Sequence, residues 1–206
     1  MKKIKVLIAD DHAIVRMGLA SILGTKKDIE VVGDAEDGAD AVRKAQKLHP
    51  DVVLMDIVMP ELDGAAATAG IRRLLPTTKV LILTSFGEAD GIAHALKAGA
   101  SGALLKNIDY SELVEAIREI ADGKTVIAPE IRKILHESPP VPELTERQRE
   151  ILLSMSRGLT DADITIQLHL TSNSVREHIT TIFNKLGAAN KTEAVAIALR
   201  KHLLKI

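Results

Sequence analysis

Short apolar runs rich in Val, Ile and Leu alternate with longer segments of helical period over residues 1–122. Four of these runs cover residues 6–9, 52–55, 80–83 and 102–105, and a further one lies around Val31. Unbroken apolar runs are typical of strands buried on both faces of a parallel sheet, and their alternation with helices is typical of βαβ units. The pattern therefore predicts an α/β domain, a doubly wound parallel sheet of five strands with five helices.

The helical segments carry apolar stripes at spacings of three or four residues. In the first segment Val15, Leu19 and Ile22 form such a stripe, and Arg16 falls outside it. Stripes of this kind predict helices that pack one face against a sheet.

A cluster of prolines divides the chain. Beyond residue 124 the alternation weakens, and prolines at positions 139, 140 and 142 predict a stiff, extended connector. Apolar residues between positions 127 and 135 could make a short helix before it. We place a linker at residues 123–142, between a domain of residues 1–122 and a second domain of residues 143–206.

The second domain shows helical patterns only. Thr145 and Thr160 each stand three residues before a Gln or an Asp, the spacing of a capping box that starts a helix. Thr171 then caps a longer segment, and a fourth helix covers residues 191–204. A short helix, a tight turn and a longer helix make up the helix-turn-helix layout, so we predict an all-α, four-helix domain of this kind.

Composition excludes several kinds of site. The chain has no cysteine, which excludes disulfides, thiolate metal sites and cysteine nucleophiles. Two Phe and one Tyr are its only aromatic residues, so stacking on nucleic-acid bases is an unfavourable mode of recognition. The sequence has neither a signal-peptide pattern nor an apolar span of about 18 residues. We therefore expect a soluble, cytoplasmic protein with no membrane partner.

Polar side chains follow four of the predicted strands. Asp10 and Asp11 follow the first run, and Asp56, Thr84 and Lys106 follow the last three in order. Ligands of open parallel sheets bind outside the carboxyl ends of the strands, so these side chains are expected at one site. Carboxylates suit Mg²⁺, which would offset the charge repulsion as Asp56 attacks phosphorus. Any single aspartate could instead cap a helix, but the whole set favours phosphoryl transfer.

Motifs around these residues carry a family resemblance. They are Ile8-Ala9-Asp10-Asp11-His12, Leu54-Met55-Asp56-Ile57-Val58-Met59-Pro60, Asp63-Gly64, Leu83-Thr84-Ser85, and Ala98-Gly99-Ala100-Ser101-Gly102 before Lys106. Residues 1–122 resemble a bacterial receiver domain of flavodoxin-like fold. The whole chain resembles a two-component response regulator of the NarL/FixJ type.

This resemblance implies a role for each matching residue. Asp56 is expected to accept a phosphoryl group from a sensor histidine kinase, while Thr84 and Lys106 contact the oxygens of that group. The expected protein contacts of Mg²⁺ are Asp10 through water, Asp11, Asp56 and the backbone carbonyl of Val58. The protein is then no enzyme in the ordinary sense, because it catalyses only its own phosphorylation and dephosphorylation.

Two positions depart from the receiver pattern. Ala103 stands where receivers usually carry an aromatic residue that rotates on phosphorylation, and Asn107 replaces a proline seen in many receivers. Alanine has no side chain to rotate. We therefore expect Thr84 and the loop through Phe86 to do more of the switching in this chain.

The second domain resembles the LuxR-type DNA-binding module. The matching segments are residues 144–152, 158–160, 171–178, 184–187 and 191–194. The resemblance places the recognition helix at residues 171–185, with Arg176, Glu177 and Thr180 on one face. Arg176 is the expected guanine contact, because Arg pairs bidentately with the O6 and N7 atoms. His178 and Lys185 are expected at phosphates, although His178 could instead be a partly buried helix residue.

Charge gives modest support for DNA binding. Residues 143–206 hold nine basic and seven acidic side chains, a net charge of +2, whereas residues 1–142 hold 18 and 21, a net charge of −3. One such module would make few phosphate contacts, so we expect a phosphorylated homodimer on two half-sites of double-stranded DNA. Val195 and Leu199 are candidate contacts between the modules. Asp161, Asp163 and Glu177 weaken the attraction to DNA, and Glu177 could also accept from a cytosine N4.

Other function classes stay open on the residues alone. A phosphohydrolase of the haloacid dehalogenase type shares a strand-end Asp, a metal and a Lys, but it needs Asp-x-Asp after its first strand, and this chain has Asp10-Asp11-His12 there. A phosphate-relay adaptor whose helical half contacts protein rather than DNA is the other alternative.

Overall fold

The computed structural model describes residues 3–85, 89–137, 144–200 and 203–204. The chain divides into two compact units, Met1–Pro140 and Val141–Ile206. Hydrophobic clusters lie on the two faces of the sheet in the first unit, and a separate cluster fills the second unit. Within the described residues, no helix has both the length and the apolar character that crossing a membrane requires.

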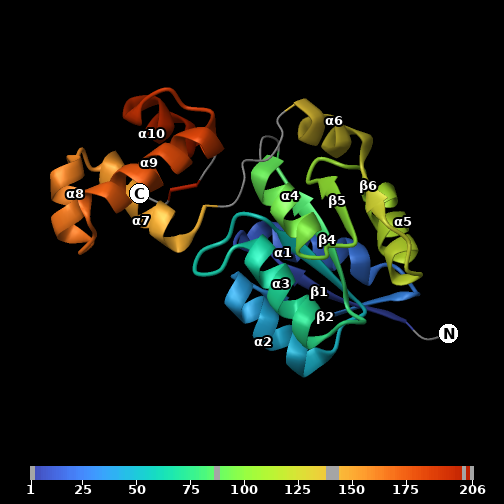
Figure 1. The fold of residues 1–206 in the computed structure, drawn as a ribbon. Helices are drawn as coiled ribbons and strands as arrows, with labels where there is room; N and C mark the ends of the chain where they lie inside the picture. Colours follow the sequence, from blue (N-terminus) through green and yellow to red (C-terminus); the bar gives the residue numbers. More distant parts are fainter. Residues whose placement is uncertain (1–2, 86–88, 138–143, 201–202, 205–206) are drawn as a thin grey trace. The chain divides into compact units, whose positions relative to one another are not determined.

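A parallel sheet of six strands in the order β2-β1-β3-β4-β5-β6 forms the centre of the first unit (Figure 1). Its strands are β1 (Ile4–Ala9), β2 (Ile29–Ala35), β3 (Val52–Asp56), β4 (Lys79–Thr84), β5 (Gly102–Leu105) and β6 (Val126–Ile127). The predicted doubly wound α/β fold is confirmed, and β6 adds a sixth strand to the five that were expected. β6 was missed because two residues are too few to show an apolar run.

Successive residues of the strands point to opposite faces of the sheet. Leu7 and Val53 belong to the cluster covered by α2 (Gly38–Leu48), α3 (Gly64–Leu74) and α4 (Ala89–Lys97). Val6 and Leu54 belong to the cluster covered by α1 (Ala13–Gly24) and α5 (Tyr110–Ala121). Because both faces are covered by helices, the strands carry the unbroken apolar runs seen in the sequence.

Local side-chain bonds set the starts of the helices around the sheet. Asp37, Asp63 and Asp109 each accept a backbone N–H at the first turn of α2, α3 and α5. In α1 the predicted stripe is shifted by one position: Leu19 and Leu23 are buried, whereas Ile22 is only half-buried. A helix has 3.6 residues per turn, so a residue four positions after Leu19 continues its stripe as well as one three positions after it.

Part of the segment predicted as a linker, residues 123–142, packs on the first unit. After Gly123, whose φ is +89°, the chain forms β6 and then α6 (Pro129–Glu137). Ile131 and Ile134 of α6 are buried in the same cluster as Ala103 of β5. This segment therefore adds one more strand and one more helix to the α/β fold, and its apolar residues pack into the core of that fold. The three prolines of the predicted connector lie outside the described residues.

Four described helices make up the second unit, as the sequence predicts. They are α7 (Glu146–Ser156), α8 (Asp161–Gln167), α9 (Ser172–Leu186) and α10 (Lys191–Arg200). The capping boxes at Thr145 and Thr160 are formed, and the Thr171 hydroxyl accepts the N–H of Ser174. One face of α9 packs into the core of this unit through Val175, Ile179 and Ile182. The opposite face of α9 is exposed.

Candidate functional site

Five of the six predicted site residues of the first unit, all except Val58, lie at the carboxyl ends of β1, β3, β4 and β5. Asp10 and Asp56 are 3% and 4% exposed, Thr84 is fully buried, and Asp11 is exposed. The N–H of Lys106 donates to the carbonyl of Thr84 over 2.8 Å, which ties the ends of β4 and β5 together. The parallel sheet thus brings these side chains to one edge, as expected.

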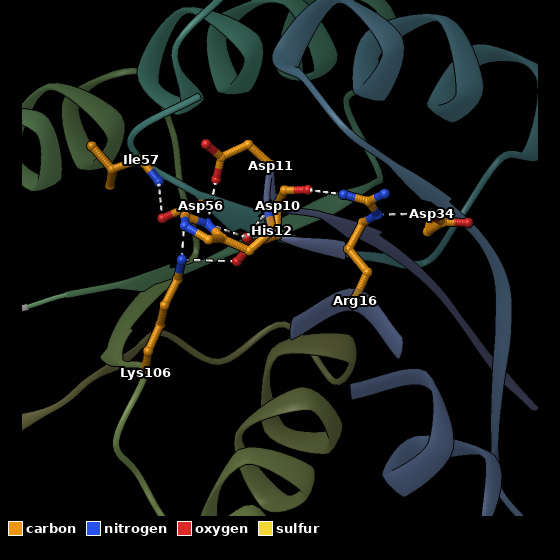
Figure 2. Close-up of polar contacts among 8 residues, drawn as sticks. All are labelled: Asp10, Asp11, His12, Arg16, Asp34, Asp56, Ile57 and Lys106. Atoms are coloured by element: carbon orange, nitrogen blue, oxygen red, sulfur yellow. Dashed lines mark hydrogen bonds and ion pairs between the residues drawn. The ribbon is translucent and has the colours of Figure 1, made fainter. Parts of the chain in front are cut away.

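The ammonium of Lys106 bridges the two buried carboxylates (Figure 2). Its Nζ lies 2.8 Å from Asp10 Oδ2 and 2.7 Å from Asp56 Oδ2. The second oxygen of Asp56, Oδ1, accepts the backbone N–H of Ile57 over 2.8 Å. Each oxygen of Asp56 therefore has a donor that holds its orientation toward the edge of the sheet.

Burial and charge act against each other on the pKa values of this pair. Burial raises the pKa of Asp56, and the nearby charge of Asp10 adds to the rise, although Lys106 opposes it. Burial also lowers the pKa of Lys106, but Asp10 and Asp56 together outweigh this effect, so the pKa of Lys106 is raised. Lys106 is therefore a fixed positive charge at neutral pH, facing more negative charge than it can balance.

Asp56 belongs to an acidic cluster that is suited to a divalent cation. Asp10, Asp11, His12 and Asp56 each offer one ligand atom, and these atoms lie within 4.8 Å of one another. Three carboxylates with one ammonium leave excess negative charge, and hard oxygen donors are those that Mg²⁺ prefers. The residues present therefore fit a magnesium ion.

His12 belongs to this cluster although the sequence did not single it out. Its Nδ1 lies 2.6 Å from Asp11 Oδ1 and 3.3 Å from Asp10 Oδ1, and its backbone N–H donates to Asp10 Oδ1 over 2.8 Å. The available signal was its position directly after the acidic pair. His12 orients both carboxylates where β1 passes into α1.

The loop between β3 and α3 explains the Asp63-Gly64 motif. The N–H of Gly64 donates to the carbonyl of Ile57 over 2.9 Å, and a Cβ at Gly64 would lie 2.0 Å from the carbonyl oxygen of Asp56. Glycine is required because the start of α3 approaches the end of β3 so closely. Val58 lies in this loop with half of its surface exposed, and a metal contact from its carbonyl stays a prediction.

The surroundings of the predicted switch residues are described in part. The hydroxyl of Thr84 donates to the carbonyl of Ser85 at a long 3.4 Å. Phe86 lies outside the described residues. Ala103 is fully buried in the cluster that contains Ile131 of α6, so the place that an aromatic residue usually takes in receivers is part of a packed core in this chain. Asn107 is exposed.

The residues predicted to contact DNA fall into two groups on α9. Arg176, Glu177 and Thr180 are exposed, and the hydroxyl of Thr180 donates to the carbonyl of Arg176 over 2.9 Å. His178 is half-buried. Lys185 is also half-buried, and its Nζ lies 2.9 Å from Gln148 Oε1, the side chain that completes the capping box of α7. Lys185 therefore joins α9 to α7, a structural contact that sequence spacing did not reveal.

Comparison with known families covers both units. Residues 6–118 match the response regulator receiver domain, and residues 142–198 match the bacterial regulatory proteins of the luxR family. The chain belongs to the response regulators with a LuxR-type DNA-binding domain. For this regulator, the receiver match decides against the haloacid dehalogenase alternative, and the luxR match decides against a helical half that serves only as an adaptor.

Relatives of this response regulator match it over nearly its whole length. The response regulator protein VraR of Staphylococcus epidermidis is 39% identical, covering 98% of this chain and 99% of VraR, and VraR of Staphylococcus aureus gives the same values. The solved structure of the response regulator ChrA, from a heme-sensing two-component system, is 35% identical with a TM-score of 0.60, covering 99% of this chain and all of ChrA. An RcsB–DNA complex, 23% identical with a TM-score of 0.65 over 97% of this chain and 99% of RcsB, shares the fold.

Proposed function

We propose that this response regulator accepts a phosphoryl group on Asp56 from a sensor histidine kinase and thereby controls its dimerisation and DNA binding. The observation that carries the proposal is the buried Asp56, held by Lys106 over 2.7 Å within an acidic cluster whose ligand atoms lie within 4.8 Å of one another. A carboxylate positioned in this way can attack phosphorus, provided that the excess negative charge around it is offset.

A magnesium ion would supply that charge neutralisation when bound. We assign its protein contacts to Asp11 directly, Asp10 through water, Asp56, and the carbonyl of Val58. His12 and the N–H of Ile57 hold the orientation of these carboxylates. Lys106 provides the second positive charge that faces the incoming group.

The transfer exchanges one bond to phosphorus for another. An oxygen of Asp56 forms the new P–O bond while the P–N bond to the histidine of the kinase breaks, and the histidine nitrogen keeps the electron pair. Thr84 and Lys106 then contact the oxygens of the phosphoryl group. The added charge rearranges these two contacts, which is a local event able to bias a two-state element. The regulator catalyses only this transfer and its own dephosphorylation.

The second unit provides the output. The luxR-family match and the exposed face of α9 support binding in the major groove of double-stranded DNA, with Arg176 as the base contact. We assign dimer formation to α10, where Leu199 is 41% exposed and Val195 is half-buried. Such a regulator would act in the cytoplasm, where kinase and DNA meet.

A DNA-selection experiment tests this function. The full chain and Asp56→Asn are each treated with acetyl phosphate and Mg²⁺, then used to select from random duplexes while light scattering reports their mass. Treated wild type is expected to form a dimer and to enrich paired half-sites, and Asp56→Asn is expected to do neither. Equal enrichment by both proteins would contradict control through Asp56.

A further inference from the structure

Arg16 makes two hydrogen bonds beside the acidic cluster, and neither is to a carboxylate of that cluster (Figure 2). Its Nη1 donates to the backbone carbonyl of Asp10 over 2.7 Å, and its Nε donates to Asp34 Oδ2 over 2.8 Å. The side chain of Arg16 is only 15% exposed. A guanidinium with two fixed acceptors is held rigidly, because its planar donors point in set directions.

The backbone of Asp34 is held by a neighbouring helix, while its side chain is 56% exposed. It lies one residue before the end of β2, and Lys44 of α2 donates to its backbone carbonyl over 2.6 Å. The backbone N–H of Asp10 donates to the carbonyl of Ala35 over 3.1 Å. Asp34 on β2 therefore anchors the guanidinium of Arg16, and that guanidinium holds the carbonyl of Asp10, the first residue after β1.

We propose that Arg16 is a positioning residue that fixes the peptide between Asp10 and Asp11, with Asp34 as its anchor, and so sets the two carboxylates for a divalent cation. The inference rests on the proposed function, since it concerns the metal site of the phosphoryl-transfer reaction. The carbonyl of Asp10 belongs to the peptide that leads into Asp11, so holding that carbonyl restricts the backbone rotations that aim both side chains. Partners behind metal ligands commonly contribute 10-fold to 100-fold to metal affinity.

The sign of the effect separates positioning from simple charge. Arg16 is a cation beside a site for another cation, so its charge alone opposes metal binding. If charge were its main effect, removing it would tighten metal binding. If positioning is its main effect, removing it weakens metal binding in spite of the lost repulsion. Arg16→Lys keeps the charge but lacks the paired donors, so it is expected to behave like Arg16→Gln.

Mn²⁺ binding to the full chain measures the effect directly. Mn²⁺ takes the same oxygen ligands as Mg²⁺, and the signal of free Mn²⁺ in electron paramagnetic resonance falls as it binds. We expect dissociation constants about 10-fold higher for Arg16→Gln, Arg16→Lys and Asp34→Asn than for wild type. Arg43→Gln is the matched control, because Arg43 is exposed on α2, where its Nη2 lies 3.1 Å from Asp40 Oδ1. The Mn²⁺ affinity of Arg43→Gln should stay within about twofold of wild type, since exposed charges are screened.

Two readouts keep the test decisive. Circular dichroism of the metal-free proteins identifies any variant that fails to fold. If one Arg16 substitution fails, the other carries the test, because Asp34→Asn also removes a negative charge and would weaken Mn²⁺ binding by charge alone. Unchanged or tighter Mn²⁺ binding by folded Arg16→Gln and Arg16→Lys would overturn the role of Arg16 and leave the proposed function standing. A wild-type chain that binds no Mn²⁺ would instead overturn the proposed metal site, and this inference with it.

Discussion

The strand-end site of the first unit and the exposed face of α9 in the second present their functional side chains in opposite ways. Asp10 and Asp56 are buried, and protein donors hold oxygens of each. Arg176 and Glu177 stand in solvent on a helix whose other face forms the core. A buried site couples function to stability, because changing one group leaves its partner without compensation. An exposed surface can change its binding partner at little cost to the fold.

The largest loss of stability is expected for a substitution at Gly64, where the backbone of the strand-end site is most crowded. Gly64→Ala places a methyl group 2.0 Å from the carbonyl oxygen of Asp56, so α3 must move away from β3. We expect the free energy of unfolding to fall by about 3 kcal/mol, the upper end for overpacking. Urea unfolding followed by circular dichroism measures this change.

The matched control lies in the second unit. Gly187 ends α9 at a φ of +66° with open space around the position of a Cβ. Gly187→Ala therefore costs only the strain of a left-handed backbone, about 1 kcal/mol. Equal losses for Gly64→Ala and Gly187→Ala would mean that the close approach of α3 to Asp56 is not a constraint on the site.

Removing the bridging ammonium tests the electrostatic side of the comparison. Lys106→Met leaves Asp10 and Asp56 buried without their cation. We expect a loss of about 2 to 3 kcal/mol in the free energy of unfolding without metal, below the fully buried case because 21% of the Lys106 side chain is exposed. Lys124→Met breaks a solvent-exposed pair with Glu119 and should lower the free energy of unfolding far less. Similar losses for the two variants, measured in urea, would argue against a stabilising bridge.

On the exposed face of α9, a substitution should change DNA binding and leave stability unchanged. Arg176→Ala is expected to weaken binding to a selected duplex by about 1 to 3 kcal/mol and to leave the unfolding transition unchanged. Fluorescence anisotropy on selected and scrambled duplexes measures the first effect. Arg149→Ala, on the exposed side of α7, serves as a control that should affect both duplexes alike. Equal weakening on both duplexes by Arg176→Ala would contradict base readout.

The smallest effect concerns the local bonds that start the helices of the second unit. Thr145→Ala removes the hydroxyl that accepts the N–H of Gln148 in the capping box of α7, and a cap of this kind contributes about 1 kcal/mol. Thr192→Ala, an exposed change in the first turn of α10, should be nearly neutral. Thermal unfolding of the two variants ranks them, and a neutral Thr145→Ala would show that packing alone fixes α7.

The sequence predicted the features that follow from period and from strand ends. The alternating apolar runs and the capping boxes predicted the elements of both units, and the position of Asp56, Thr84 and Lys106 after strands predicted their meeting at one edge. Each of these signals is local, so it can be recognised in the sequence without knowledge of tertiary contacts. The one-position shift from Ile22 to Leu23 in α1 reflects the limited precision of a stripe read on one helix.

Contacts between distant segments were not predictable in the same way. β6 pairs two residues with β5, and α6 covers the cluster around Ala103, but neither has a long enough pattern to stand out. Arg16 was read only as a polar residue outside its stripe, because a bond to the carbonyl of Asp10 depends on backbone geometry. The bond from Lys185 of α9 to Gln148 of α7 likewise joins two residues that are 37 positions apart in the chain.

Intact-mass spectrometry of the full chain treated with acetyl phosphate is the most direct test of the central claim that Asp56 is the phosphoryl acceptor of a magnesium-dependent site. Wild type is expected to gain the mass of one phosphoryl group with Mg²⁺ and none with a chelator, while Asp56→Asn gains none under either condition. Asp63 is the N-cap of α3 and lies seven residues after Asp56 in the chain. The variant Asp63→Asn should be modified like wild type. Equal modification of Asp56→Asn and wild type, or modification of wild type that ignores the metal, would contradict the account.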